Sequence, residues 1–443
     1  MNSLNVWMNG ELVGVWSVER GGTHVFSYEQ SWAKSPNGRA LSLSLPITEV
    51  RAVRGPVVES WFDNLLPDSR LIRERVRTRF GIKSARAFEL LAAIGRDCVG
   101  AVQLLPTDAK PTGFDRIDST PINDDAVERL LLGLTARPDP EAEDLDDFRI
   151  SIAGAQEKTA LLRIGKKWHR PHGATPSTHI LKLPLGLIGG RRLDMRDSVE
   201  NEWLCAQIVE ALGLPVAPTE MAVFGRQKVL AVERFDRRRI DKKWIARLPQ
   251  EDLCQATATP ADRKYERDGG PGIRQCLALL GASEAREHDR TTFVLAQLSF
   301  WLLAATDGHA KNFSIVLKPG HDYALTPLYD IISMWPMIGA GANRIAPQDA
   351  RLAMALRGKN AHYRLKDIQT RHWQQLAATC GVPDAWSSML ALVERVDKAL
   401  NQVEQRLPPD FPEPLWKKIA KGMRGQVAVF RAGLIGAHVR VPR

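Results

Sequence analysis

The sequence predicts an α+β protein with a β-rich N-terminal subdomain and a two-lobed core whose C-terminal lobe is helical. Short strand-like segments separated by turn residues fill positions 4–47 and recur between positions 149 and 235. Helical spacing of apolar residues dominates after position 270. Strands followed by helices are typical of the α+β class. The 443 residues are enough for two or three domains, each with its own core.

Composition and charge narrow the class of protein. Hydrophobic residues make up 44% and charged residues 25% of the chain, which is ordinary for a globular protein. The formal net charge of +10 favours polyanionic partners such as nucleic acid or nucleotide phosphates, although solvated surface also explains much of it. The five cysteines form no C-x-x-C pair, which indicates core positions in a reducing cytosol rather than disulfides or zinc. No signal peptide or run of 18 apolar residues is present, so we expect a cytoplasmic protein without a membrane segment.

Residues 1–105 are predicted to form the N-terminal subdomain. Leu4–Met8 and Glu11–Trp16 flank Asn9-Gly10, a strong signal for a tight β-hairpin, and His24–Tyr28 reads as a further strand. Residues 57–95 have helical spacing, with five arginines between positions 70 and 79. We interpret this arginine-rich face as solvated, with contact to a phosphate backbone as the alternative. The proline-rich stretch 106–147 is predicted to be a connector that contains one short helix near Asp125–Leu134.

The core is predicted to begin near position 148, with a smaller lobe over 148–240 and a larger lobe over 241–443. In the smaller lobe we expect strands at 149–152, 159–164, 179–184 and 229–235 and a helix over Ser198–Leu212. In the larger lobe, apolar residues at helical spacing predict a core helix over Asp289–Thr306. This helix leads directly into the segment that carries the strongest chemical signal.

That segment holds Asp307 and Asn312 five residues apart, followed by Asp330 at the end of an apolar run. Phosphoryl transfer on a protein-kinase plan needs one carboxylate at the acceptor hydroxyl, an amide oxygen a short loop later, and a second carboxylate that holds magnesium. The spacing alone is weak, because Asp and Asn are common in caps and turns. Within the same loop, Lys311 is the better candidate to contact the γ-phosphate, and His309 could contact it or orient the loop.

Lys182 is a second candidate, because it lies alone in the apolar strand Ile180–Leu183. Burying a lysine is costly unless an anion meets it, and kinases place such a lysine on a strand to bind the α- and β-phosphates. The alternative is an edge strand whose lysine points to water. Glu200 or Glu202, on the following helix, could pair with Lys182.

Two further segments occupy the positions along the chain where a kinase has its phosphate-covering loop and its adenine-binding segment. The residues around Gly154 could cover phosphates, although they form no G-x-G-x-x-G motif and a hairpin turn explains them equally well. Glu233, Arg234 and Phe235 follow the last strand, where backbone groups would bind adenine; a salt-bridged strand end is the alternative. The ordered set predicts a protein-kinase-like core, while the absence of H-R-D and D-F-G excludes an ordinary protein kinase.

The chain resembles the HipA family, bacterial serine/threonine kinases that act as toxins of type II toxin–antitoxin modules. The resemblance covers nearly the whole chain. It is carried by long motifs: W-M-N-G (7–10), L-S-L-S-L-P (41–46), F-D-N-L-L-P-D-S (62–69), I-G-R-D-C-V-G-A-V (94–102), D-F-R-I-S-I-A-G-A-Q-E-K-T-A-L-L (147–162), A-V-E-R-F-D-R (231–237), L-P-Q-E-D (248–252), A-T-D-G-H-A-K-N-F-S (305–314) and L-Y-D-I-I-S (328–333).

The resemblance implies a role for each matching residue. Asp307 would be the catalytic base, Asn312 and Asp330 the magnesium ligands, and Ser151 the autophosphorylation site whose modification expels the phosphate loop. A phosphate at Ser151, in a loop flanked by Arg149, would compete with ATP for the same donors. The residues expected to bind ATP are Ala153, Gly154, Ala155, Gln156, Glu157, Lys158, Lys182, Glu233, Arg234, Phe235, His309, Lys311, Asn312, Tyr329 and Asp330.

The resemblance also implies partners and a biological effect. The substrate would be a translation component, glutamyl-tRNA synthetase, whose phosphorylation arrests growth and produces persistence. The antitoxin would be a HipB-like helix-turn-helix protein, and the toxin–antitoxin complex would bind operator DNA and repress its operon. By charge alone, Lys366, Arg371 and the basic stretch 414–443 are candidates for DNA contact.

Two other functions remain open at this point. A small-molecule kinase of aminoglycoside or lipid type uses the same kind of catalytic and metal-binding loops, but would lack an autophosphorylated Ser151. A transcriptional corepressor with a vestigial ATP site would be insensitive to the loss of Asp307. The intact set of Lys182, Asp307, Asn312 and Asp330 favours an ATP- and magnesium-dependent protein kinase.

Overall fold

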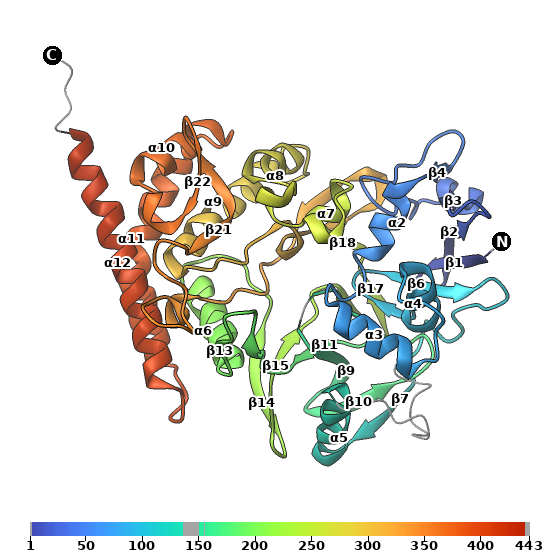
Figure 1. Cartoon of the computed structure of the whole chain (residues 1–443). Coiled ribbons are helices and arrows are strands. Elements are labelled where there is room, and N and C mark those ends of the chain that lie inside the picture. Colours follow the sequence, from blue (N-terminus) through green and yellow to red (C-terminus); the bar gives the residue numbers. More distant parts are fainter. Residues whose placement is uncertain (1, 136–149, 155, 439–443) are drawn as a thin grey trace. The chain divides into compact units, whose positions relative to one another are not determined.

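The computed structural model describes residues 2–135, 150–154 and 156–438 (Figure 1). The chain divides into two compact units. The first unit comprises the residues up to Leu183 together with Ala222–Lys264 and Ser314–Thr326. The second unit comprises Pro184–Met221, Tyr265–Phe313 and the residues from Pro327 onward. Ala155 and Arg149, which the sequence placed in the phosphate loop and beside Ser151, lie outside the described residues.

A five-stranded antiparallel sheet of order β4-β3-β2-β1-β6 begins the first unit. Its strands are β1 (Asn2–Met8), β2 (Glu11–Val18), β3 (His24–Tyr28), β4 (Ala52–Arg54) and β6 (Val102–Pro106). Asn9 and Gly10 both have positive φ angles, 48° and 86°, as the predicted two-residue hairpin turn requires. The predicted hairpin and the strand at 24–28 are therefore confirmed.

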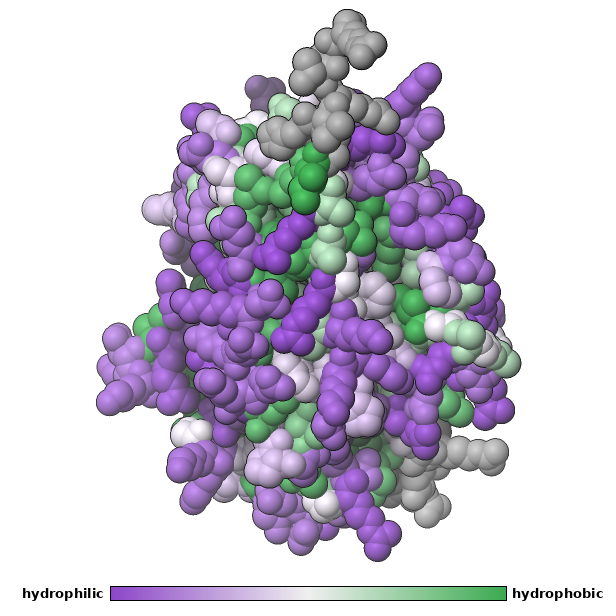
Figure 2. Space-filling view, turned by 90° about the vertical axis from the view of Figure 1, so that its left-hand side faces the viewer, coloured by the Kyte–Doolittle hydropathy of each residue, from purple (hydrophilic) through white to green (hydrophobic). Residues whose placement is uncertain are grey.

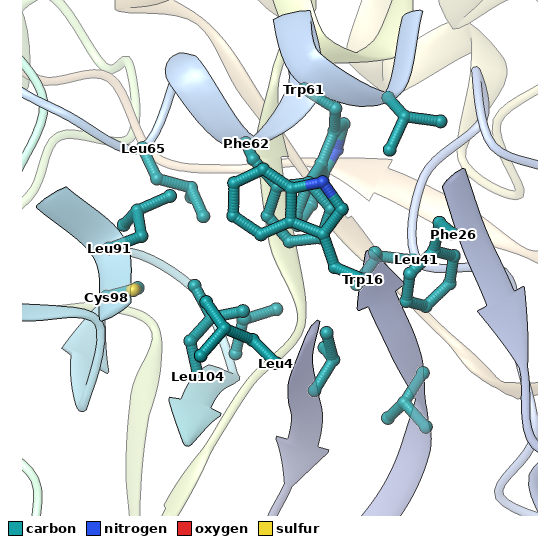
Figure 3. Packing of buried hydrophobic residues seen from close by; sticks show 14 of the residues in the cluster. Leu4, Trp16, Phe26, Leu41, Trp61, Phe62, Leu65, Leu91, Cys98 and Leu104 are labelled. Carbon is teal, nitrogen blue, oxygen red and sulfur yellow. The ribbon is translucent and has the colours of Figure 1, made fainter. Parts of the chain in front are cut away.

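The helices of this subdomain bury one face of that sheet. They are α1 (Gln30–Lys34), α2 (Pro56–Asp63), α3 (Arg70–Arg79) and α4 (Ala87–Ile94). Phe62 of α2 stacks on Trp16 of β2, with ring centroids 3.9 Å apart and planes within 7° (Figure 3). Leu65, Leu91 and Cys98 contribute to the same buried cluster. Burying aromatic rings of this size supplies much of the hydrophobic stabilisation of a small subdomain.

The arginines of α3 bond mainly within the first unit. Arg73 pairs with Asp63 at 2.6 Å and Arg75 pairs with Glu157. Arg77 bonds Glu74 one turn away, and Arg79 donates to the backbone oxygen of Gly133. Arg73, Arg75 and Arg79 therefore contact other segments of the chain, whereas Arg77 is 39% exposed and lies on the solvated side that the sequence suggested. Spacing along a helix could not reveal the acceptors, because Asp63, Glu157 and Gly133 come from other segments of the chain.

A six-stranded sheet of order β14-β15-β11-β9-β10-β7 carries the predicted phosphate-binding strands. Its strands are β7 (Ser119–Ile122), β9 (Lys158–Ile164), β10 (Lys167–Pro171), β11 (His179–Lys182), β14 (Thr219–Phe224) and β15 (Gln227–Glu233). Helix α5 (Asp124–Thr135) packs Val127 and Leu131 into the cluster below it. Because β7 and α5 belong to this sheet and its core, the stretch 106–147 is more than the connector expected from its prolines.

The first unit also contains two smaller strand pairs and one three-stranded sheet. The pairs are β5 (Asp97–Cys98) with β8 (Ile150–Ser151) and β16 (Arg237–Ile240) with β17 (Trp244–Arg247). The three-stranded sheet consists of β18 (Gln250–Asp252), β19 (Ser314–Leu317) and β20 (Tyr323–Leu325). The short helix α7 (Leu253–Ala256) follows β18. The β5–β8 pair is parallel and sets Cys98 opposite Ser151.

The second unit is mainly helical. Its helices are α6 (Ser198–Ala211), α8 (Ile273–Leu280), α9 (Arg286–Leu303), α10 (Thr370–Thr379), α11 (Ala385–Glu404) and α12 (Glu413–His438), and its hairpins are β12 (Gly186–Ile188) with β13 (Leu193–Met195) and β21 (Arg351–Arg357) with β22 (Ala361–Arg364). Trp301 of α9 is fully buried, with its ring centroid 5.7 Å from that of Trp373. The α+β class and the helices predicted at 198–212 and 289–306 are confirmed, but the predicted larger lobe, 241–443, is not all helix, because it also contains the strands β17 to β22.

Helix α12, at the left of Figure 1, faces the viewer in Figure 2. Hydrophilic residues predominate on this face, with hydrophobic residues showing between them. Two apolar residues of α12, Val429 and Ile435, are exposed. All five cysteines are buried, in keeping with their expected role as core residues. Within the described part of the chain, no helix is long and apolar enough to cross a membrane.

Candidate active site

The loop that carries Asp307 begins where α9 ends. Ala304 caps the helix in the left-handed conformation, with φ 49°, and turns the chain out of the helix axis. Gly308 then passes directly over the ring of Phe300, where any added Cβ atom would overlap ring carbons. This close approach explains why a glycine follows Asp307. The segment Ala310–Asn312 closes as a single 3₁₀ turn.

Hydrogen bonds inside the loop fix Asp307 and Asn312 relative to each other. The side-chain nitrogen of Asn312 donates to the backbone oxygen of Asp307 at 2.8 Å, and the backbone N–H of His309 donates to the same oxygen at 2.8 Å. The Asn312 side chain is buried, whereas 60% of the Asp307 side chain is exposed. With its nitrogen engaged, Asn312 presents its side-chain oxygen, the ligand type that a hard cation prefers.

Two other predicted residues of this loop, His309 and Lys311, are buried. The hydroxyl of Tyr329 donates to the backbone oxygen of Lys311 at 2.9 Å, which joins the segment around Asp330 to the loop around Asp307. The structure therefore brings six of the predicted residues together within the second unit. They are Asp307, His309, Lys311, Asn312, Tyr329 and Asp330.

Asp330 adopts a backbone conformation that few residues other than glycine tolerate. Its φ angle is 59°, in the left-handed region, where asparagine and aspartate are the commonest exceptions. On its N-terminal side, Leu328 forms a parallel bridge with Val216, with hydrogen bonds of 2.9 Å to Pro215 and from Ala217. Strained residues of this kind persist only where the surrounding structure holds them.

On the C-terminal side, Ser333 ties the Asp330 segment to both neighbouring helices. The side chain of Asn201, on α6, donates to the backbone oxygen of Ser333 at 2.8 Å and accepts from its N–H at 2.9 Å. The Ser333 hydroxyl donates to the backbone oxygen of Leu303, the last residue of α9, at 2.6 Å. One buried serine thus sets the Asp330 segment against the helix that ends just before Asp307.

The donor chemistry of this site fits magnesium. Asn312 and Asp330 offer one amide oxygen and one carboxylate, and Mg²⁺ characteristically takes one or two such protein ligands and fills its remaining positions with water and substrate phosphates. In the part of the chain that the structure describes, no group of three or more His, Cys, Asp or Glu side chains is placed to hold a metal ion.

The first unit holds the other residues expected to bind ATP. Lys182 ends β11, where it is paired with Leu230 on one side and Lys158 on the other, and it is 6% exposed. The alternative of an edge-strand lysine that points to water is therefore wrong, because β11 lies between β9 and β15. Glu200 and Glu202, both on α6, are buried as well, and which of them would pair with Lys182 stays a prediction.

The expected phosphate loop, residues 153–158, is held by residues of the N-terminal subdomain. Gly154 has a φ angle of 111°, and its backbone oxygen accepts from the N–H of Asp68 at 2.9 Å. Glu157 pairs with Arg75, and Gln156 donates to the backbone oxygen of Leu183. The Lys158 side chain turns back to the oxygen of Ala153 at 2.5 Å.

The segment expected to bind adenine contains one solvent-exposed residue, Glu233, next to a buried cluster of ion pairs. Glu233 is exposed and Phe235 is half-buried, whereas the Arg234 guanidinium is buried, bonds Asp236 at 2.8 Å and donates to the backbone oxygen of Cys98 at 2.7 Å. The salt-bridge alternative describes this side chain, so contact with adenine would have to use the backbone. Burial raises the pKa of Asp97 in the same cluster, but attraction to Arg237, Arg234 and Arg247 outweighs burial and holds this pKa well below its ordinary value.

The family of the chain follows from comparison with known proteins. Residues 4–105 match the family model of the HipA N-terminal domain, and residues 150–407 match that of the HipA-like C-terminal domain. The chain belongs to the HipA family. Because HipA-like relatives are named as kinases, the chain is identified as a protein kinase of HipA type, as its motifs predicted.

Two relatives and one solved structure show how far the HipA likeness extends. The "Putative kinase Y4mE" of Sinorhizobium fredii is 33% identical over 386 residues, which cover 86% of each chain. The "Serine/threonine-protein kinase toxin HipA" of Shewanella oneidensis is 28% identical over 408 residues, 87% of this chain and 86% of that protein. The solved Shewanella oneidensis complex of HipA, HipB and operator DNA matches with a TM-score of 0.78 and 24% identity, over 99% of this chain and 100% of that one, which shows a shared fold.

Sequence reasoning missed several residues that shape this HipA-type site. Ser333 lies inside the motif at 328–333 and Asn201 lies near the start of a predicted helix, but nothing in the sequence joined them. Leu65 and Asp68 lie in the motif at 62–69 and Arg75 in the arginine-rich stretch that follows it, and their contacts with Ser151 and the phosphate loop appear only in the fold. Tyr265, which contacts Asp307, lies in none of the motifs.

Proposed function

We propose that this chain is an ATP- and magnesium-dependent serine/threonine kinase toxin in which Asp307 is the catalytic base. The observation that supports this proposal best is the double attachment of Ser333 to Asn201 and Leu303, because it sets the segment of Asp330 beside the loop of Asp307 and Asn312. A base and two oxygen ligands held on one rigid support are what phosphoryl transfer requires.

In the proposed reaction the hydroxyl oxygen of an acceptor serine attacks the γ-phosphorus of ATP. The bond from this phosphorus to the β,γ-bridging oxygen breaks, ADP leaves with the bond electrons, and the hydroxyl proton passes to the Asp307 carboxylate. The exposed Asp307 side chain is open to such an acceptor. Bound Mg²⁺, held by Asn312 and Asp330, would neutralise phosphate charge.

The nucleotide side of the proposal rests on the first unit. The buried ammonium of Lys182 would contact the α- and β-phosphates, since a buried cation on a central strand is costly unless an anion meets it. Residues 153–158 would cover the phosphates, and the backbone of residues 233–235 would contact adenine. His309, Lys311 and Tyr329 would complete the γ-phosphate surroundings from the loops of the second unit.

Autophosphorylation of Ser151 is part of this proposal. The Ser151 side chain is fully buried, and its hydroxyl donates to the backbone oxygen of Leu65 at 2.8 Å. Modification therefore requires β8 to leave β5 first. A phosphate dianion could not return to this buried position without a large desolvation cost, so the modified loop would stay displaced.

The proposed partners come from the HipA relatives. The Shewanella oneidensis HipA structure was solved with HipB and operator DNA, and we propose a HipB-like helix-turn-helix antitoxin and operator DNA as partners of this chain. Lys366, Arg371 and the lysines of α12 are exposed, as DNA contacts would need to be. Glutamyl-tRNA synthetase in the cytoplasm is the proposed substrate, and growth arrest the proposed effect.

The deciding experiment compares the wild type with Asp307→Asn and Ser151→Ala after incubation with γ-labelled ATP and Mg²⁺. We expect one phosphate on Ser151 in the wild type and none on either variant, read by intact mass and peptide mapping. We also expect Ser151→Ala, but not Asp307→Asn, to label added glutamyl-tRNA synthetase. A wild-type preparation that is free of phosphate and still takes up no label would contradict the kinase function and favour a DNA-bound corepressor.

A further inference from the structure

Tyr265 approaches Asp307 from a different segment of the second unit. It precedes the short 3₁₀ turn Glu266–Asp268, and its hydroxyl donates a hydrogen bond to Oδ1 of Asp307. Its ring meets the ring of His309 edge to face, with centroids 5.0 Å apart and planes at 87°. The guanidinium carbon of Arg267 lies 5.4 Å from the centroid of the Tyr265 ring. These contacts of the ring with His309 and Arg267 therefore order the phenol before any substrate arrives.

The two groups around the Asp307 carboxylate converge on the same oxygen. Besides the Tyr265 hydroxyl, Nε2 of the buried His309 lies 3.8 Å from Oδ1. Because 60% of the Asp307 side chain is exposed, solvent alone would leave the carboxylate several orientations. A base has to present one defined oxygen to the acceptor hydroxyl, and loss of that orientation lowers the rate of the chemical step.

We propose that Tyr265 is a positioning residue of this kinase: it holds Oδ1 of Asp307 and leaves Oδ2 to accept the proton of the acceptor serine. The inference rests on the proposed role of Asp307 as base. The Tyr265 hydroxyl itself transfers no phosphate and contacts no nucleotide in this scheme. Its effect should therefore fall on kcat rather than on the affinity for ATP.

The test measures initial rates of ADP release from Mg-ATP, which every phosphoryl transfer by this chain produces, whatever the acceptor. The variants are Tyr265→Phe, which keeps the ring and removes the hydroxyl, and Asp307→Asn as the inactive reference. Tyr363→Phe is the matched control, because it deletes the same oxygen from a half-buried tyrosine on β22 of the same unit. Binding of a non-hydrolysable ATP analogue and the melting temperature are measured on each protein.

We expect Tyr265→Phe to lower kcat about tenfold, in the lower range for loss of a hydrogen bond to a charged group, because Asp307 is largely exposed. The KM for ATP, the analogue Kd and the melting temperature should stay at wild-type values, and Tyr363→Phe should match the wild type throughout. If Tyr265→Phe has a kcat within twofold of the wild type and Asp307→Asn is inactive, the inference is overturned. Full activity of Asp307→Asn would instead overturn the proposed function itself.

A second measurement separates positioning from packing. Replacing Tyr265 with 3,5-difluorotyrosine keeps the size of the ring but lets the phenol ionise at lower pH than an ordinary tyrosine, whose pKa lies near 10. An ionised phenol cannot donate to Asp307 and repels its carboxylate. We therefore expect kcat of this protein to fall as the fluorinated phenol ionises, in a pH range where the wild type keeps its activity. Identical pH profiles would show that the ring only packs against His309.

Discussion

The hydroxyl of Ser151 donates a 2.8 Å hydrogen bond to the backbone oxygen of Leu65, deep inside the first unit. The same stretch of the N-terminal subdomain holds the phosphate loop at two more points. The N–H of Asp68 bonds the oxygen of Gly154, and Arg75 pairs with Glu157. Residues 65–75 therefore act as a clamp on β8 and the loop that follows it, and Ser151 becomes accessible only when these contacts break.

Weakening this clamp should speed autophosphorylation. Arg75→Ala removes the partner of Glu157, whose side chain is 22% exposed. Because a partly exposed ion pair contributes about 0.5–1 kcal/mol, we expect Ser151 to be modified about two to five times faster than in the wild type. The rate is measured by intact mass over time with Mg-ATP.

Arg77→Ala is the matched control for this experiment. Arg77 lies on the same helix and bonds only Glu74 of that helix among the contacts found. Its loss removes a more exposed ion pair, with side chains 39% and 41% exposed, without touching the phosphate loop. Equal acceleration by both variants would show that α3 acts through its general stability rather than through the contact with Glu157.

The support of Asp330 by Asn201 gives a second prediction. Asn201→Ala leaves the buried N–H and backbone oxygen of Ser333 without their partner, so we expect the free energy of unfolding to fall by about 2–4 kcal/mol. Above the lowered melting temperature the protein unfolds, and below it kcat should still be at least tenfold reduced, because the segment of Asp330 loses its attachment to α6.

Asn401→Ala, an exposed position on α11, is the control for Asn201→Ala and should change neither stability nor kcat. Both quantities are followed by thermal unfolding and by initial rates well below the transition. Normal kcat in a destabilised Asn201→Ala protein would mean that the Leu328 bridge and the Ser333–Leu303 bond suffice to hold Asp330.

Replacement of Lys182 should separate binding from folding. Lys182→Met keeps the length of the side chain but removes the charge, and we expect kcat/KM for ATP to fall at least a hundredfold. The melting temperature is measured on the same proteins, because it shows whether the buried ammonium on β11 also contributes to the fold. Lys167→Met, at an exposed strand position, is the control. Strong destabilisation by Lys182→Met would indicate that the ammonium serves the fold.

The lowered pKa of His179 predicts that the protein loses stability in acid. Burial, aided by repulsion from Arg163, lowers its pKa from 6.5 to about 4, so the folded protein binds the proton more weakly than the unfolded chain. The stability that His179 provides is complete above pH 6.5 and is lost as the pH falls toward 4, by up to about 3 kcal/mol.

The variant His179→Phe keeps an aromatic ring beside Trp168 and cannot take up a proton. Urea unfolding between pH 4 and pH 7.5 should therefore show a shallower decline for this variant than for the wild type. His288→Gln, on the exposed face of α9, should leave the wild-type curve unchanged. Parallel curves for the wild type and His179→Phe would place the acid sensitivity elsewhere.

Local patterns in the sequence were sufficient where neighbouring residues decide the outcome. The Asn9-Gly10 turn, the strand at 24–28 and the core helix before Asp307 follow from turn chemistry and apolar spacing, which act over a few residues. The motif at 305–314 likewise placed Asp307 and Asn312 on one loop, because only four residues separate them. The family followed from motifs of the same kind, long enough to be specific.

Only the tertiary structure decided which distant residues support these groups. Asn201 meets Ser333, Tyr265 meets Asp307 and Arg75 meets Glu157, each across 42 or more positions of sequence. Such contacts depend on how helices and strands pack, and packing is selected by burial summed over the whole unit rather than by any local pattern. For the same reason the prolines of 106–147 suggested a connector, whereas in the fold β7 is a strand of the sheet that carries Lys182 and α5 buries Val127 and Leu131 in the core beside that sheet.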